Sequence, residues 1–169
     1  MTTSEKVAQL LLKINAITLN PKKPFKYASG ILSPVYTDCR TIISFPKERK
    51  IIRDLYVNAI NEVGELFDLI AGTATAGIPH AALIAHKMNL PMIYVRGKAK
   101  DHGKGNQIEG ILNKKQKAAI IEDLVSTAES SVETARAIRE AGGRADYVFA
   151  IITYQMDKSK ENLKINKAI

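Results

Sequence analysis

The chain has 169 residues, of which 46% are hydrophobic and 25% are charged. This length and composition are typical of one folded domain with its own core, and they exclude a disordered or low-complexity protein. No apolar run approaches the roughly 20 residues that a membrane-spanning helix requires. The first residues, MTTSEKVAQLLLKIN, lack the basic start and cleavage site of a signal peptide, so we expect a cytoplasmic protein without a membrane partner.

The chain carries 25 Lys and Arg against 17 Asp and Glu, a net charge of +8, and the surplus is concentrated in one segment. Residues 96–117 hold seven basic and two acidic side chains, and residues 98–110 (KAKDHGKGNQIEG) contain the glycines of a loop. This pattern favours a small anionic ligand such as a phosphate ester. We expect no nucleic-acid partner, because aromatic residues do not alternate with the basic ones. For Lys114, Lys115 and Lys117 a solvated basic face is the alternative interpretation.

Apolar residues recur at helical spacing over residues 4–15, where Thr2 and Glu5 predict a capping box. The next stretch, LNPKKPFKYASGILSPVYTDCR, contains three prolines and predicts irregular chain with short extended pieces. Pro46 begins a second helix, and short apolar runs then alternate with helices. The spacing predicts strands at residues 67–72, 91–95, 117–123 and 145–154, and helices at residues 77–88 and 130–141.

Apolar strands joined by helices indicate an α/β fold with a parallel sheet covered on both faces. We expect a single domain over residues 1–169. An N-terminal helix and hood (1–45) precede a core (46–156), and a polar tail (157–169) follows it. Ligands of such sheets bind where strands end, so the strand ends are where we expect the chemistry.

The strongest motif is AAIIEDLVSTAES, where a strand delivers Glu122 and Asp123 and residues 124–130 run into a helix. Ser130 and Glu133 predict a capping box there. Amides at a helix start, together with the loop hydroxyls, favour a phosphate group, and paired carboxylates suit sugar hydroxyls beside it. The alternative is an ordinary capped turn between a strand and a helix.

Two further segments could complete an anion site. Residues 71–79 (AGTATAGIP) are small enough for the backbone to approach a diphosphate, although a plain tight turn has the same composition. The basic loop begins with Arg96, Lys100 and His102.

We expect no metal site made by the protein alone. His102 has no His or carboxylate at ligand spacing, and His80 and His86 do not share a helix face, so both are interpreted as structural. Cys39 is the only cysteine, which excludes an intrachain disulfide and predicts a packed thiol.

Together the three loops resemble those of type I phosphoribosyltransferases, which use phosphoribosyl pyrophosphate (PRPP). Residues 25–40 (FKYASGILSPVYTDCR) resemble the substrate-side segment of the orotate phosphoribosyltransferase family, and residues 95–110 (VRGKAKDHGKGNQIEG) resemble its catalytic loop. Four motifs follow the family's order across residues 20–155. The resemblance implies a mostly parallel central sheet flanked by helices, with a small N-terminal hood.

The resemblance also implies the reaction and the partners. PRPP and orotate would give orotidine 5′-monophosphate and pyrophosphate in the de novo synthesis of UMP, with Mg²⁺ as cofactor held mostly by the ligand. The protein would be a homodimer in which Arg96, Lys100 and His102 act in the neighbouring subunit's site. The alternatives are a PRPP-sensing regulator without catalysis and a phosphoribosyltransferase for another base. Retention of Lys100 and His102 favours the enzyme.

The residue roles that the resemblance implies fall into four sets. Catalysis would use Lys100, His102 and Asp123. PRPP would be bound by Arg96, Lys100, His102, Glu122, Asp123, Leu124, Val125, Ser126, Thr127, Ala128, Glu129 and Ser130. The pyrophosphate loop would be Thr73, Ala74, Thr75, Ala76 and Gly77. Orotate would be bound by Ser29, Gly30 and Ser126.

The chain departs from the family pattern at several positions. Ala128 and Glu129 stand where many members have Gly-Gly or Ala-Gly, and Gly97 stands where many have a second lysine. Residues 154–156 occupy the region where some members carry an arginine near orotate. We expect the C-terminal helix of longer members to be missing or reduced.

Overall fold

The computed structural model describes residues 2–26, 30, 32–97 and 107–165, which fall into two compact units, residues 1–52 and 53–169. The first unit begins with helix α1 (Thr3–Lys13) and ends in the first part of helix α2 (Pro46–Glu62), which continues into the second unit. Between the helices lie β1 (Ile17–Leu19), β2 (Phe25–Lys26), β3 (Leu32–Ser33), β4 (Val35–Thr37) and the 3-10 helix η1 (Cys39–Ser44). β1 pairs with β4 and β2 pairs with β3, both antiparallel, so the expected irregular stretch contains two short ribbons.

The first unit confirms two local predictions. The Thr2 hydroxyl accepts a hydrogen bond from the Glu5 N–H (3.2 Å), and the Glu5 carboxylate accepts one from the Thr2 N–H (2.7 Å), which is the predicted capping box. The Cys39 thiol is buried at 1% exposure, as expected of a packed cysteine. The Lys13 ammonium contacts the Glu48 carboxylate at 2.8 Å and joins α1 to the start of α2.

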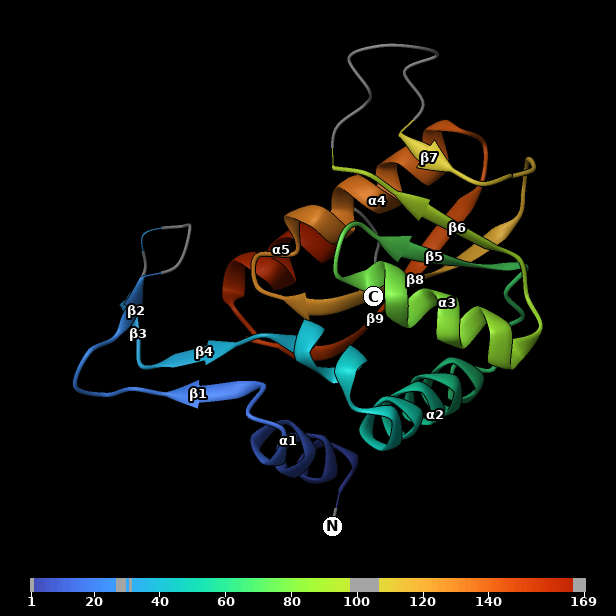
Figure 1. Ribbon diagram of the computed structural model, residues 1–169. Coiled ribbons are helices and arrows are strands. Elements are labelled where there is room, and N and C mark those ends of the chain that lie inside the picture. The colour runs from blue at the N-terminus through green and yellow to red at the C-terminus, as the bar shows by residue number, and fades with distance from the viewer. Residues whose placement is uncertain (1, 27–29, 31, 98–106, 166–169) are drawn as a thin grey trace. The chain divides into compact units, whose positions relative to one another are not determined.

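The second unit is built on a five-stranded sheet in the order β7-β6-β5-β8-β9 (Figure 1). All neighbours pair in parallel except β7, which is antiparallel to β6, so the predicted parallel sheet is confirmed. The strands are β5 (Leu69–Thr73), β6 (Met92–Val95), β7 (Ile108–Glu109), β8 (Lys117–Val125) and β9 (Arg144–Thr153). The helices are α3 (Gly77–Met88), α4 (Glu129–Glu140) and α5 (Asp157–Ile165).

Helices α3 and α4 cover opposite faces of this sheet (Figure 1). Leu69 and Ala71 of β5 belong to the buried cluster that contains Ala135 and Ile138 of α4. Gly72, which points the other way, lies so close to α3 that an added Cβ would be 3.0 Å from the Ala81 Cβ. The sheet is therefore buried on both faces, which explains why its strands are apolar throughout.

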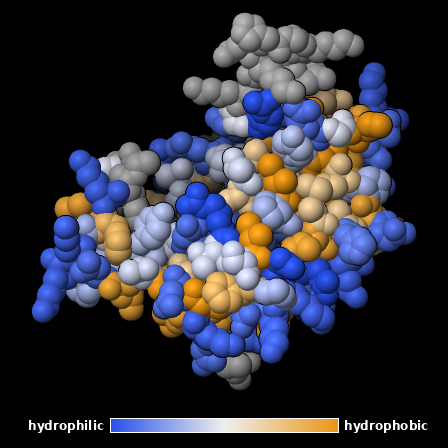
Figure 2. Space-filling model, in the orientation of Figure 1, coloured by the Kyte–Doolittle hydropathy of each residue, from blue (hydrophilic) through white to orange (hydrophobic). Residues whose placement is uncertain are grey.

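The visible face of the molecule is mixed in polarity, and hydrophobic residues gather over the part occupied by α3 and β6 (Figure 2). The sequence of α3, GIPHAALIAHKM, has one lysine and no carboxylate, whereas α4, ESSVETARAIRE, alternates charges with apolar residues. Helix α3 is therefore apolar beyond its packed face, while α4 presents charges to the solvent.

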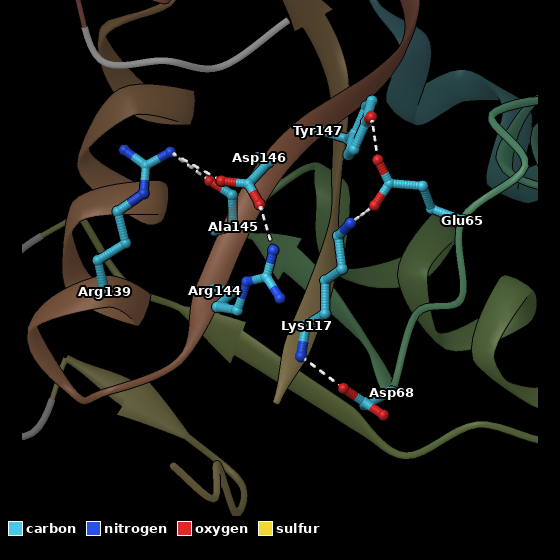
Figure 3. A network of polar contacts seen from close by, with 8 residues as sticks. All are labelled: Glu65, Asp68, Lys117, Arg139, Arg144, Ala145, Asp146 and Tyr147. Atoms are coloured by element: carbon cyan, nitrogen blue, oxygen red, sulfur yellow. Dashed lines mark hydrogen bonds and ion pairs between the residues drawn. The ribbon is translucent and has the colours of Figure 1, made fainter. Parts of the chain in front are cut away.

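Lys117, the first residue of β8, is buried, so the interpretation as part of a solvated basic face is wrong for it. Its ammonium forms an ion pair with Glu65 (Figure 3). It lies 5.5 Å from the ring centroid of Phe67 and 5.2 Å from that of Tyr147. The Tyr147 hydroxyl donates to the same Glu65 carboxylate at 2.5 Å, and the Lys117 N–H donates to Asp68 at 2.7 Å. A buried ammonium requires this kind of pairing.

Lys114 and Lys115 are exposed, as a solvated face requires.

Candidate active site

Strands β5 and β8 are hydrogen-bonded neighbours from Leu69↔Ala118 to Gly72↔Ile121, and β8 continues beyond this pairing to Val125. The segment after β5 therefore lies beside Ile121 and Glu122 of β8. At Gly77, which begins α3, any Cβ would collide with the carbonyl oxygen of Ile121, so only glycine fits there. The buried Thr134 hydroxyl of α4 donates to the Thr73 hydroxyl at 3.2 Å and joins α4 to the end of β5.

The residues expected to face a diphosphate run from the end of β5 to the start of α3: Thr73, Ala74, Thr75, Ala76 and Gly77. The peptide bond between Ala74 and Thr75 is cis. The Ala74 N–H donates to the Val95 carbonyl of β6 at 2.9 Å, so the start of the loop is held by the neighbouring strand.

The two carboxyl groups at the end of β8 lie in different environments. Glu122 is 4% exposed, and its carboxyl accepts hydrogen bonds from Ser130 Oγ (2.9 Å), Ser131 Oγ (3.4 Å) and the Asp123 N–H (3.2 Å). Burial raises the pKa of Glu122 to about 8; the Ser130 hydrogen bond acts in the opposite direction, and the nearby charge of Asp123 adds to the rise. The environment of Glu122 therefore favours its protonated form. Asp123 is half-exposed and is the carboxyl of the pair that a ligand can reach.

Two aromatic side chains lie beneath the end of β8. The Tyr56 hydroxyl of α2 donates to the backbone carbonyl of Glu122 at 2.5 Å, and its ring lies 6.2 Å from the ring of His80. His80 is buried, and within the described ranges its Nε2 has no hydrogen-bond partner. Burial lowers the pKa of His80, and the charge of Asp123 opposes this shift. A buried His80 agrees with the structural interpretation, and His86 is exposed.

The N-cap of helix α4 lies two residues before the predicted cap, Ser130. It is Ala128, which has a left-handed backbone (φ 66°) and provides no side-chain hydrogen bond to the helix start. The predicted Ser130–Glu133 capping box is therefore wrong, because the Ser130 hydroxyl donates to the buried carboxyl of Glu122 instead. The N–H groups of residues 128–131 have no acceptor within the helix and remain available to an anion.

The rest of the predicted phosphate segment is accounted for by β8 and the loop after it. Leu124 and Val125 are the last residues of β8, and the Val125 carbonyl accepts from the Tyr154 N–H at 3.0 Å. Ser126 and Thr127 are half-buried loop residues.

Helix α5 contacts residues 124–130, the segment expected to bind phosphate and called the phosphate loop below. Sequence reasoning missed this contact because residues 157–169 were interpreted only as a polar tail. Asn162 Nδ2 donates to the Thr127 carbonyl at 2.8 Å, and the Lys158 ammonium lies 3.0 Å from the Glu129 carboxylate. Glu129 is exposed, so the carboxylate that is unusual for this loop points to solvent and to α5. Nothing in the spacing of residues 157–165 predicts these contacts.

The base of the basic loop is a β-hairpin between β6 and β7. The Arg96 N–H donates to the Gln107 carbonyl at 2.9 Å, and the Arg96 guanidinium lies 3.7 Å from the Glu109 carboxylate. Lys100 and His102 lie outside the described residues.

Of the two residues expected near orotate in the hood, Ser29 also lies outside the described residues. Gly30 has a left-handed backbone (φ 85°), a conformation that favours glycine.

No helix in the described ranges is long and apolar enough to cross a membrane. Among the same residues, no group of three or more His, Cys, Asp or Glu side chains could hold a metal ion.

The site combines three features: a loop of small residues, a Glu–Asp pair on the neighbouring parallel strand, and a helix N-terminus without a side-chain cap. Together they define the class of the type I phosphoribosyltransferases. Solved structures agree with this class. A phosphoribosyltransferase from Corynebacterium diphtheriae superposes with a TM-score of 0.77 at 19% identity, covering 98% of this chain and 91% of that one. The orotate phosphoribosyltransferase of Aeropyrum pernix superposes with a TM-score of 0.81 at 26% identity, covering 95% and 88%.

Curated relatives identify the family within this class. The orotate phosphoribosyltransferase of Coxiella burnetii is 51% identical over 162 residues, which are 96% of this chain and 78% of that protein. The corresponding protein of Listeria innocua is 50% identical over 164 residues, 97% of this chain and 78% of the relative. No protein-family model matches the chain. The chain belongs to the orotate phosphoribosyltransferase family.

Proposed function

We propose that this protein transfers the phosphoribosyl group of PRPP to N1 of orotate, giving orotidine 5′-monophosphate and pyrophosphate for UMP synthesis. The bond from the ribose C1 to the diphosphate oxygen breaks and its electron pair leaves with pyrophosphate. A bond from C1 to N1 forms as N1 loses its proton to the pyrophosphate or the solvent. The observation that carries the proposal is the close packing of residues 73–77 against β8 at Ile121 and Glu122 and against Thr134 of α4. Identity of about half the chain to curated orotate enzymes supports orotate as the base.

The transition state places positive charge on the ribose and negative charge on the departing diphosphate, so preorganised charges are the main catalytic requirement. Asp123, the accessible carboxyl of the pair, would hold the ribose hydroxyls near the positive charge. Glu122, whose burial favours the protonated form, would hold Ser130 and the loop in place without adding a second negative charge. The N–H groups at the start of α4 would bind the 5-phosphate.

The basic loop would supply the positive charges that face the diphosphate. We assign Arg96, Lys100 and His102 to this task, with Lys100 as the main stabiliser of the leaving group, in the site of a partner subunit. A mixture of the single variants Lys100→Ala and Asp123→Asn tests the shared site, because a mixed dimer would contain one site with both residues intact. Activity that returns on mixing supports the arrangement, and absence of recovery after confirmed subunit exchange contradicts it.

The residues present fit a Mg²⁺ ion that is bound chiefly by PRPP. The Glu122 carboxyl is occupied by three hydrogen bonds, which leaves Asp123 as the carboxylate of the pair that can face the ion, and Mg²⁺ in phosphate sites takes few protein ligands. When bound, the ion would neutralise charge on the diphosphate.

The proposal is tested by mixing the protein with orotate, PRPP and Mg²⁺ and following the loss of orotate absorbance. Turnover with orotate, and none with adenine or hypoxanthine, is the expected result. PRPP binding without turnover of any base would instead support the non-catalytic regulator. Turnover of another base would replace orotate in the proposal.

A further inference from the structure

Helix α5 contacts the phosphate loop on both sides of Ala128. On one side Asn162 Nδ2 donates to the Thr127 carbonyl at 2.8 Å, and on the other the Lys158 ammonium lies 3.0 Å from the Glu129 carboxylate. Figure 1 shows α5 against the start of α4, in agreement with the contacts between these helices. The ion pair is exposed and contributes little, so the hydrogen bond of the half-buried Asn162 is the important contact.

The loop needs such a support because of its residue at the helix cap. Ala128 has φ 66°, in the left-handed region where an L-residue with a Cβ is disfavoured and glycine is not. Ala128 is also buried, so its conformation is defined by surrounding contacts as well as by its own preference. A chain with alanine at this position therefore requires another interaction to keep the cap conformation populated.

Asn162 supplies that interaction through the peptide group between Thr127 and Ala128. This bond is trans, and in a planar trans peptide the C=O and the following N–H point in opposite directions. When Asn162 holds the Thr127 carbonyl toward α5, the Ala128 N–H is directed away from α5. We infer that Asn162 is a positioning residue that orients the Ala128 N–H toward the 5-phosphate of PRPP and so compensates for the missing glycine. This inference rests on the proposed function.

The test compares two anions that occupy different parts of the site. Ribose 5-phosphate carries only the 5-phosphate and reports on the α4 cradle, whereas pyrophosphate reports on the loop after β5. Loss of one hydrogen bond corresponds to an equilibrium change of about 3- to 10-fold. In Asn162→Ala the Kd for ribose 5-phosphate and the KM for PRPP should rise by about this factor. The Kd for pyrophosphate, kcat and the unfolding temperature should stay close to wild type.

Lys160→Ala is the matched control, since Lys160 is an exposed residue of the same helix whose ammonium pairs with Asp157. It should bind ribose 5-phosphate like wild type. Ala128→Gly introduced into Asn162→Ala should restore most of the affinity, because glycine adopts the left-handed cap without support. If Asn162→Ala does not fold, Asn162→Asp takes its place, because a carboxylate cannot donate to the Thr127 carbonyl.

Unchanged ribose 5-phosphate affinity in the Asn162 variant would overturn the inference. An equal loss of this affinity in Lys160→Ala, or an equal loss of affinity for ribose 5-phosphate and pyrophosphate in the Asn162 variant, would do the same. Lack of rescue by Ala128→Gly would show that Asn162 acts in some other way. A wild-type protein that binds neither PRPP nor ribose 5-phosphate would overturn the proposed function itself, so the two failures are distinguishable.

Discussion

Replacing Glu122 by glutamine tests whether this buried carboxyl carries a proton at neutral pH. Glutamine has the shape of the protonated acid. Its carbonyl can accept from the Asp123 N–H, and its amide can donate to Ser130 or Ser131, whose hydroxyls are able to accept. The Glu122→Gln protein should therefore fold with about the stability that wild type has in mildly acidic solution.

The magnitude follows from the two pKa values of Glu122. Its pKa is about 8 in the folded protein against an ordinary 4.5, so between these values the folded state holds a proton that the unfolded chain releases. The contribution of Glu122 to the free energy of unfolding is complete below the lower value and is lost as the pH rises to the higher one. The slope is about 1.4 kcal/mol per pH unit, or about 2 kcal/mol between roughly pH 5.5 and pH 7.

Urea unfolding at a series of pH values measures the free energy of unfolding of wild type and Glu122→Gln. Equal m-values serve as a check on two-state unfolding. The variant should gain about 2 kcal/mol relative to wild type across that pH range. Glu140→Gln is the control, because it makes the same replacement at an exposed position of helix α4, and it should show a nearly constant difference from wild type. A difference between Glu122→Gln and wild type that does not change with pH would refute a protonated Glu122.

Three further substitutions probe other parts of the molecule. Gly77→Ala should destabilise the protein by about 2 kcal/mol or more and reduce activity, because the new Cβ meets the rigid Ile121 carbonyl; urea unfolding and steady-state kinetics measure both. Lys117→Met should lower the free energy of unfolding by about 1–3 kcal/mol, because it leaves the Glu65 carboxylate without its ammonium partner. PRPP affinity should stay unchanged, because Lys117 lies at the opposite end of β8 from the site. Altered PRPP binding would contradict this separation. Lys100→Ala should reduce kcat by about 10²–10³ with a much smaller change in PRPP affinity, and an equal loss in both would indicate a binding role only.

The parallel sheet and its helices are predictable because their patterns are local. Helix α3 occupies the predicted residues, since its apolar spacing and the small residues before it identify a strand-to-helix turn. β7 is missed because two residues are too few to show a period, and its pairing depends on β6. α5 is missed because a largely polar segment becomes a helix here through contacts with α4 and the phosphate loop.

The site is predictable in its residue types but not in their protonation or partners. The sequence places Glu122 beside Asp123, yet only the packing of α4 over β8 determines that one is buried and the other accessible. Ser130 matches a capping box with Glu133 in its local pattern, and a nonlocal contact with Glu122 prevails because a buried carboxyl needs hydrogen bonds. Tertiary contacts decided each of these outcomes.

The pairing of β5 with β8 sets a distance that side chains do not control. Neighbouring strands lie about 4.8 Å apart, and backbone hydrogen bonds hold that spacing up to Gly72 and Ile121, directly before Glu122. The distance between the proposed binding segments for the diphosphate and for the 5-phosphate is therefore set by the main chain. Substitutions in the loops alter how tightly each group is bound but leave the distance between the strands unchanged. Selection for a different base can then act on other segments while the fit to the length of phosphoribosyl pyrophosphate is retained.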